Sequence, residues 1–294
     1  MVQSLGCATI LKTLNGWEFN SSIKVLLEVL ILLLVGLPIL LLATIGSPRQ
    51  RGFYCSDDTL FYPLLPSTIS NNVLIIGGTF IPIVTMLIIE IFKDSPGNDT
   101  EDGFCKRCSP SKMKAIAPMI GYFIFGCGCI LALTLVVKYN IGGLRPHFHA
   151  ACQTDWNSIK ANCSETLHPV YIHTIPCLNQ DQHVLDEARL SFFSGHASFS
   201  AFTMIYLIFY LEDRFTWHHP ALLKPFIQFL CLLITVYISI SRVFDYHHHW
   251  SDVLFGFLVG GIMAYLISKY VSGLLKGRRT REMKAVKVDK VDPV

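Results

Sequence analysis

Three short segments of the chain carry side chains suited to binding a phosphate group and attacking it. In chain order they hold Lys138 and Arg145, then Ser194-Gly195-His196, then Arg242, His248 and Asp252. Lysine and arginine neutralise an anion, and the arginine fork can donate two parallel hydrogen bonds to a phosphate. A phosphate monoester carries about −1.5 to −2 charges at neutral pH, which three cations around one site would match.

The third segment supplies a candidate nucleophile. His248 and Asp252 are four residues apart, the spacing that places two side chains one above the other on a helix. A carboxylate there can hold one ring nitrogen and leave the other free to attack, as in a catalytic triad. No carboxylate stands four residues beyond His247 or His249, so the spacing singles out His248. A metal-binding histidine cluster is the alternative, but three adjacent histidines point in different directions on a helix.

The second segment sits at the predicted start of a helix. Exposed backbone N–H groups at such a position face an incoming anion, and Gly195 lets the backbone approach it closely. The structural alternative is an N-cap serine followed by a surface histidine, and taken alone that alternative is favoured for Ser194 and His196.

The composition indicates the environment in which these segments must be positioned. Of the 294 residues, 52% are hydrophobic and only 15% are charged, whereas soluble domains average about 25% charged residues. A spanning helix needs about 20 mostly apolar residues. Three segments meet this well and three less well: 25–45, 73–92 and 115–137, then 194–212, 222–241 and 253–274. The weaker three would suit buried helices of a soluble domain, but their strong neighbours argue against that reading.

The sequence therefore predicts an all-α, polytopic membrane protein with six transmembrane helices. Seventeen of the 24 basic residues fall on the side that holds both termini, which predicts cytosolic termini. The chain then divides into a cytosolic segment at 1–24, a membrane domain at 25–275 and a basic cytosolic tail at 276–294. Loops 46–72, 138–193 and 242–252 face the outside or the lumen. The net charge of +3 gives no case for nucleic-acid binding.

Cysteines and glycosylation signals bear on this topology. Four cysteines fall in the outer loops, where disulfides can form, although their pairing cannot be read from the sequence; they are Cys55, Cys152, Cys163 and Cys177. Asn162 heads a glycosylation signal in the long outer loop and is expected to carry sugar. Asn20 and Asn98 head similar signals on the inner side and should stay unmodified.

The predicted orientation changes the interpretation of the three cations. Each of Lys138, Arg145 and Arg242 alone would be read as an anchor or an ordinary turn residue. All three lie on the outer face, against the bias that places basic residues inside. Their joint placement favours a phosphate site.

The three segments together resemble the signature of the type-2 phosphatidic acid phosphatase superfamily: K-x6-RP, SGH and SR-x5-H-x3-D, in this order. Within it, the chain is most similar to animal lipid phosphate phosphatases, over residues 48–275. The similarity includes Gln50–Cys55, Leu144–Phe148 and Trp250–Leu254. One departure is Phe193, where the wider superfamily usually has proline before SGH.

The resemblance implies a role for each motif residue. His248 would form a phosphohistidine, Asp252 would orient it, and His196 would protonate the leaving alkoxide. The phosphoryl oxygens would be bound by Lys138, Arg145, Ser194, Gly195 and Arg242. No metal or other cofactor is required, because the cations supply the positive charge. The implied substrates are phosphatidic acid, lysophosphatidic acid, sphingosine 1-phosphate and ceramide 1-phosphate, and the sequence does not choose among them.

The family also sets expectations for location and assembly. Its members are often at the plasma membrane, with endomembranes as the alternative, and are often homo-oligomers. Two other functions stay open: a same-fold enzyme that acts on a soluble phosphate ester or transfers lipid headgroups, and a non-catalytic lipid-binding or transport protein. Transporter sites tend to lie near the midplane of the membrane, whereas the candidate residues here lie at one face.

Overall fold

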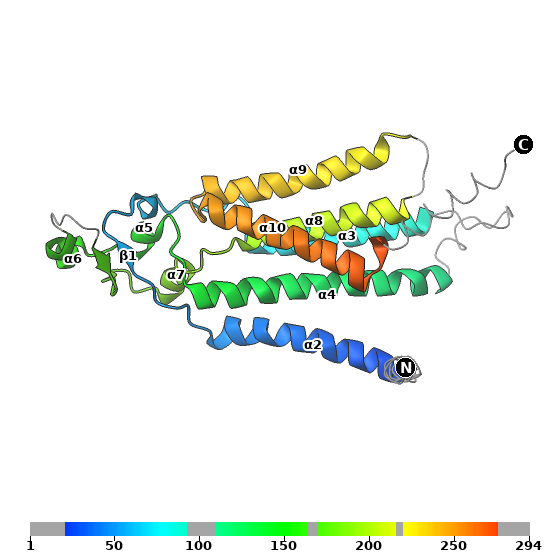
Figure 1. Cartoon of the computed structure of the whole chain (residues 1–294), viewed down its shortest axis with the longest axis horizontal. Helices are drawn as coiled ribbons and strands as arrows, with labels where there is room; N and C mark the ends of the chain where they lie inside the picture. Colours follow the sequence, from blue (N-terminus) through cyan, green and yellow to red (C-terminus); the bar gives the residue numbers. More distant parts are fainter. Residues whose placement is uncertain (1–20, 93–109, 164–169, 216–219, 276–294) are drawn as a thin grey trace, which may run out of the picture.

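The computed structural model describes residues 21–92, 110–163, 170–215 and 220–275. Most of these residues are helical, as the sequence predicts, and the long helices run side by side in an elongated bundle (Figure 1). The long helices are α2 (Ser21–Ile45), α3 (Asn71–Phe92), α4 (Pro110–Ile141), α8 (Gly195–Arg214), α9 (Leu223–Phe244) and α10 (Trp250–Leu266), which a π-helical turn, η2 (Ile267–Val271), continues.

Five helices are long and apolar enough to cross a membrane, which indicates a multi-pass membrane protein. The candidate spans are Val25–Ile45, Asn71–Ile91, Ile116–Ile141, Leu223–Phe244 and Trp250–Val271. They match five of the six predicted segments to within a few residues. The third span extends beyond its predicted end at 137, so Lys138 lies inside the last turn of α4.

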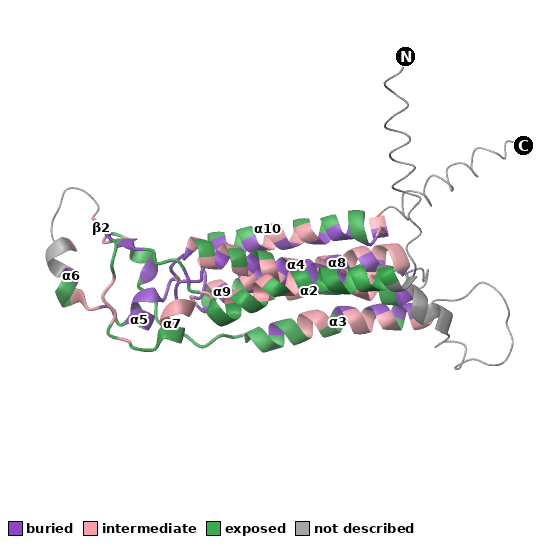
Figure 2. Ribbon diagram, turned by 90° about the horizontal axis from the view of Figure 1, so that it is seen from below, coloured by how far each residue is buried: buried purple, intermediate pink, exposed green. Residues whose placement is uncertain are grey.

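The remaining predicted segment, 194–212, corresponds to α8, which is not among those five spans. Buried hydroxyl residues on this helix, Ser198, Ser200 and Thr203, lower its hydropathy. The hydroxyls of Ser200 and Thr203 donate to backbone carbonyls one turn earlier, which satisfies them inside the bundle. Helices α3, α4, α9 and α10 all pack against α8 (Figures 1 and 2). Because its neighbours shield it, α8 does not need an apolar outer surface.

Helices α8 and α10 approach closely at two glycines. A Cβ atom on Gly256 would lie 2.6 Å from the carbonyl oxygen of Ser194, and one on Gly260 would collide with that of Ser198. Small residues allow two helix backbones to pack this tightly inside a membrane. The contact fixes the first turn of α10 beside the first turn of α8.

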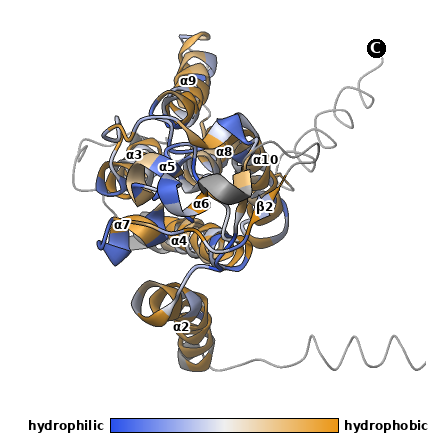
Figure 3. Ribbon diagram, turned by 90° about the vertical axis from the view of Figure 1, so that its left-hand side faces the viewer, coloured by the Kyte–Doolittle hydropathy of each residue, from blue (hydrophilic) through white to orange (hydrophobic). Residues whose placement is uncertain are grey.

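Helix α2 stands apart from the other long helices and packs mainly against α4 (Figure 3). Its large apolar side chains are exposed along most of its length, including Leu26, Leu33 and Leu40. In a bilayer this surface meets lipid tails, so its exposure to solvent in the isolated chain is the expected property of a span.

A small subdomain, here called the loop subdomain, covers the end of the bundle where α4 ends and α8 and α10 begin (Figure 1). It contains β1 (Phe53–Tyr54), η1 (Asp58–Leu60), α5 (Phe148–Cys152), α6 (Trp156–Cys163), β2 (Tyr171–Ile172) and α7 (Gln182–Glu187), with β1 and β2 antiparallel. Disulfides Cys55–Cys163 and Cys152–Cys177 resolve the pairing that the sequence left open. Cys55–Cys163 ties the first predicted outer loop to the second, and Cys152–Cys177 closes a loop within the second.

Several predictions fall on residues outside the described ranges. Most of the N-terminal segment at 1–24, the whole tail at 276–294, and both Asn20 and Asn98 lie there. Asn162 lies within α6, but its side chain is not among the described ones. The domain division and the glycosylation of Asn162 therefore remain predictions.

Candidate active site

The predicted site residues gather at the end of the bundle beneath the loop subdomain. Lys138 lies in the last turn of α4 and Arg242 in the last turn of α9. Ser194 caps the start of α8, and Asp252 lies in the first turn of α10. Helix ends therefore position most of these groups, and the loop after α4 brings Arg145 to them.

The geometry around Asp252 differs from the predicted helical pair. Helix α10 begins only at Trp250, with His249 as its N-cap, so His248 precedes the helix. Its Nδ1 lies 3.9 Å from Oδ2 of Asp252, whereas Nδ1 of His249 lies 3.3 Å from the same oxygen. The inference that His249 lacks a carboxylate partner was wrong, because the N-cap and third helical positions also bring side chains together.

Burial distinguishes His248 from His249 more clearly than their sequence spacing from Asp252 does. The side chain of His248 is 3% exposed and that of His249 is 26% exposed. Burial lowers the pKa of His248 well below its ordinary value, the cations Lys138 and Arg145 lower it further, and Asp252 opposes both effects. The imidazole of His248 is therefore neutral at pH 7 and faces the cations.

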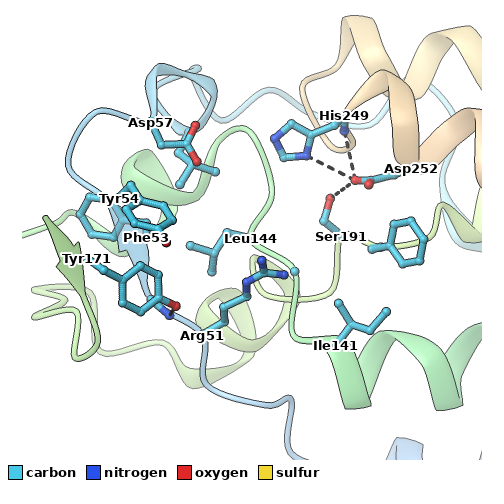
Figure 4. A pocket seen from close by; sticks show the side chains of 14 residues that line it. Arg51, Phe53, Tyr54, Asp57, Ile141, Leu144, Tyr171, Ser191, His249 and Asp252 are labelled. Carbon is cyan, nitrogen blue, oxygen red and sulfur yellow. Dashed lines mark hydrogen bonds and ion pairs between the residues drawn. The ribbon is translucent and has the colours of Figure 1, made fainter. Parts of the chain in front are cut away.

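A residue that the sequence analysis missed, Ser191, completes this group. Its hydroxyl donates to Oδ2 of Asp252 at 2.5 Å and lies 3.5 Å from Nδ1 of His248. Figure 4 shows Ser191 and His249 both directed at the Asp252 carboxylate. The Nδ1 side of the His248 ring is thus engaged, which leaves Nε2 as the atom for attack.

The start of α8 is joined directly to this group. The backbone N–H of Ser194 donates to the carbonyl of Asp252 at 3.1 Å, and its Oγ accepts from the N–H of Ala197 at 3.4 Å. A Cβ on Gly195 would lie 3.4 Å from Thr134 and 3.9 Å from the Lys138 side chain. The first N–H groups of a helix lack intrahelical partners. Because Gly195 lies beside the Lys138 side chain, the first N–H groups of α8 and Lys138 border the same space.

His196 and Arg242 share one acceptor in the first predicted outer loop. Nε2 of His196 lies 2.9 Å from the carbonyl oxygen of Ile69, and a terminal nitrogen of Arg242 lies 3.3 Å from it. Because a carbonyl only accepts, the ring of His196 carries a proton on Nε2. Arg242 also donates to the hydroxyl of Ser67 at 3.2 Å.

Arg242 also forms an ion pair with Asp245. The ion pair spans 3.5 Å, and the carboxylate also accepts from the backbone N–H and hydroxyl of Thr68 at 2.8 and 2.7 Å. Sequence reasoning missed Ser67, Thr68 and Ile69, because they lie about 70 residues before the first motif and form no motif of their own. Asp245 lies inside the third segment, and its position three residues after Arg242 was the available signal.

Arg145 is held by two side chains that the sequence analysis did not assign. One terminal nitrogen lies 3.3 Å from Nδ1 of His247, whose Nε2 lies 3.1 Å from the Ser67 hydroxyl. The other terminal nitrogen forms a 2.8 Å ion pair with Glu187 at the end of α7. Ser67 thus links the surroundings of Arg145 to those of Arg242.

Lys138 is buried and donates to the backbone carbonyl of Leu190 at 2.5 Å, next to Ser191 in the chain. All eight predicted site residues therefore belong to one connected group of contacts. A pocket of about 430 Å³ adjoins this group on the side of Asp252 and His249, with Arg51, Tyr54 and Tyr171 from the loop subdomain also lining it (Figure 4).

The arrangement suits transfer of a phosphoryl group. Two buried cations, Lys138 and Arg242, the partly buried Arg145 and a helix N-terminus can bind an anion, and a neutral imidazole backed by a carboxylate can attack it. Lys138 and Arg242 already have fixed partners, so the positive charges that they bring to the reacting group are preorganised.

Comparisons with known proteins point to the same chemistry. The family model described as the PAP2 superfamily matches residues 119–276, which contain all eight residues. The chain is 39% identical over 254 residues to phospholipid phosphatase 1 of Rattus norvegicus, covering 86% of each protein. It is 37% identical over 258 residues to phospholipid phosphatase 2 of Mus musculus and of Homo sapiens, covering 86% of this chain and 88% and 84% of theirs. No solved structure gave a significant match.

Proposed function

Because this chain belongs to the PAP2 superfamily, we propose that it is an integral membrane phosphatase that removes phosphate from lipid phosphomonoesters. The observation that carries the proposal is the meeting of His248 and Asp252 with three cations, two of them buried, at one end of the bundle. The similarity to phospholipid phosphatases over most of the chain supports a lipid as the substrate.

The substrate phosphate would replace water between the cations and the start of α8. Lys138, Arg145 and Arg242 offset its two negative charges, and the N–H groups after Ser194 donate to its oxygens. Gly195 leaves room for this approach, since a side chain there would point toward Thr134 and Lys138.

The reaction would proceed in two steps. Nε2 of His248 attacks phosphorus, the P–O bond to the lipid breaks, and His196, acting as an imidazolium with both ring nitrogens protonated, gives one proton to the leaving alkoxide and becomes neutral. Asp252 stabilises the positive charge on the His248 ring through Nδ1. Water then attacks the phosphohistidine, gives a proton back to His196, and releases inorganic phosphate with neutral His248.

In the membrane, α8 would act as the sixth span, inside a ring of neighbouring helices, with both termini cytosolic. The site then lies at the extracellular or lumenal headgroups, where a lipid tail can stay in the bilayer while its phosphate reaches the cations. Phosphatidic acid, lysophosphatidic acid, sphingosine 1-phosphate and ceramide 1-phosphate all meet this requirement.

Other features follow from the same orientation. Asn162 would be glycosylated, since it would face the lumen during synthesis. Location at the plasma membrane and assembly into homo-oligomers follow from the family alone. The decisive check on orientation is the shift in gel mobility on glycosidase treatment, which should vanish in Asn162→Gln.

The function is tested with purified full-length protein in detergent micelles containing each lipid phosphate and EDTA. Wild type should release phosphate, and His248→Ala should release at least about a thousandfold less, because it removes the nucleophile. His183→Ala is the matched control, since His183 is an exposed histidine of α7. Persistent hydrolysis by His248→Ala would refute the mechanism, and a wild type active only on soluble phosphate esters would refute the lipid substrate.

A further inference from the structure

Arg145, one of the three cations proposed to bind phosphate, is paired with a carboxylate of the protein itself. Its ion pair with Glu187 spans 2.8 Å, and the exposed fractions of the two side chains are 12% for Arg145 and 45% for Glu187. A phosphoryl group bound by the same guanidinium would meet the negative charge of Glu187 at close range. Glu187 must therefore either move or weaken phosphate binding.

The other two cations have partners that cannot leave in this way. Asp245, beside Arg242, is buried and is fixed by two hydrogen bonds from Thr68. Lys138 donates to the backbone carbonyl of Leu190. Of the carboxylates that the described structure places in ion pairs with these three cations, Glu187 is the exposed one.

The position of Glu187 allows it to turn into water. It is the last residue of α7, a six-residue helix without buried residues. Because the Glu187 side chain is 45% exposed, water can solvate its carboxylate when it leaves Arg145, which lowers the cost of breaking the pair. Most of the Arg145 side chain is buried, and its Nε is a buried atom with no hydrogen-bond partner within the described part of the chain. A mostly buried guanidinium is destabilised when it loses its anion, and Glu187 can serve as that anion when no phosphate is bound.

We propose that Glu187 is a displaceable carboxylate, which pairs with the phosphoryl-binding fork of Arg145 and competes with inorganic phosphate for it. The inference rests on the proposed function and adds to it a means of product release. Phosphate enters as Glu187 turns outward, and the return of Glu187 to Arg145 favours departure of the phosphate product.

The test compares Glu187→Gln with Asp186→Asn. Each removes one negative charge from α7, but Asp186 accepts a hydrogen bond from Gln182 at 2.8 Å and does not pair with Arg145. Binding of inorganic phosphate is measured from the rise of the thermal unfolding midpoint with phosphate concentration, which needs no turnover. Inhibition of lipid phosphate hydrolysis by phosphate is measured in parallel.

We expect Glu187→Gln to lower the dissociation constant of phosphate roughly two- to fivefold, the range for losing one half-exposed competing ion pair. Asp186→Asn should stay within about 1.5-fold of wild type on the same scale. An unchanged constant in Glu187→Gln would overturn the proposal, and a raised one would show that Glu187 only holds Arg145 in place. Phosphate binding could tighten as expected while no form of the protein hydrolyses lipid phosphates. That result would refute the proposed function but support the exchange of Glu187 for phosphate at Arg145.

Discussion

The hydroxyl of Ser191 donates a 2.5 Å hydrogen bond to Oδ2 of Asp252. Ser191 lies in the segment that leads into α8, and Asp252 lies in the first turn of α10. This bond therefore joins the start of α8, with its proposed anion-binding N–H groups, to the start of α10, which follows the proposed nucleophile His248. It also fixes the carboxylate that is proposed to orient the His248 ring.

Replacing Ser191 by alanine should slow turnover without unfolding the protein. Loss of one hydrogen bond to a charged group costs about 1.5 kcal/mol, which predicts a fall in kcat of about tenfold. Ser251→Ala is the control, because Ser251 is exposed next to Asp252 in the chain. A normal kcat in Ser191→Ala would show that Asp252 needs no second support.

The two histidines near Asp252 should differ sharply in their importance. His248→Gln should abolish formation of a phosphoenzyme, because it removes the ring that is proposed to supply the attacking nitrogen. His249→Gln should keep it, with kcat lowered about tenfold or less, because only the orientation of Asp252 is disturbed. Acid-sensitive label trapped from a radioactive lipid phosphate distinguishes them. Label retained in His248→Gln and lost in His249→Gln would make His249 the nucleophile.

The close approach of α8 and α10 makes Gly256 sensitive to substitution. A Cβ at this position would lie 2.6 Å from the Ser194 carbonyl oxygen, which belongs to the backbone and cannot move aside alone. Gly256→Ala should lower stability by about 1–3 kcal/mol and reduce kcat by separating the two helix starts. Thermal unfolding and hydrolysis measure both. Gly77→Ala, where a Cβ would meet nothing within 4 Å, should behave as wild type.

The two disulfides should contribute unequally. Cys55–Cys163 closes 108 residues of sequence and Cys152–Cys177 closes 25, so the chain-entropy model predicts about 1 kcal/mol more stabilisation from the first. The first also anchors the loop that leads to Ser67 and Ile69. Unfolding midpoint and kcat should therefore fall further in the paired Cys→Ser variant of Cys55–Cys163. Equal losses in the two paired variants would contradict this ranking.

His149 should make the loop subdomain sensitive to acid. It is buried among Phe53, Phe61 and Trp156, and burial lowers its pKa to about 4. Because the folded pKa lies below the ordinary 6.5, the unfolded chain binds more protons as pH falls below 6.5. The associated stability is complete above about pH 6.5 and decreases as the pH falls toward 4.

His149→Phe should reduce the stability difference between pH 7 and pH 5 by an amount on the order of 1–2 kcal/mol, because phenylalanine binds no proton. Thermal unfolding midpoints at the two pH values measure this difference. His183→Asn, which changes an exposed histidine, should leave the pH dependence unaltered. The same dependence in His149→Phe as in wild type would place the acid-sensitive group elsewhere.

The sequence by itself determined which chemistry is present and where the spans lie. Apolar runs specify helices because a bilayer leaves few other ways to satisfy the backbone, so five spans were located to within a few residues. The eight motif residues could be chosen because cations, an imidazole and a carboxylate recur at fixed local spacings. Local spacing also led to one wrong inference. It excluded His249 as a partner of Asp252, whereas the start of α10 at Trp250 brings His249 to that carboxylate.

Only the tertiary structure decided which groups meet across the chain. Three contacts illustrate this: the hydrogen bond from Ser191 to Asp252, the Ile69 carbonyl shared by His196 and Arg242, and the ion pair of Glu187 with Arg145. Each joins segments that share no sequence pattern. The central burial of α8 likewise depends on its neighbours, which is why its hydropathy alone is a weak signal. Contacts of this kind arise from the packing of helix ends and loops in space, and a linear spacing rule carries no information about them.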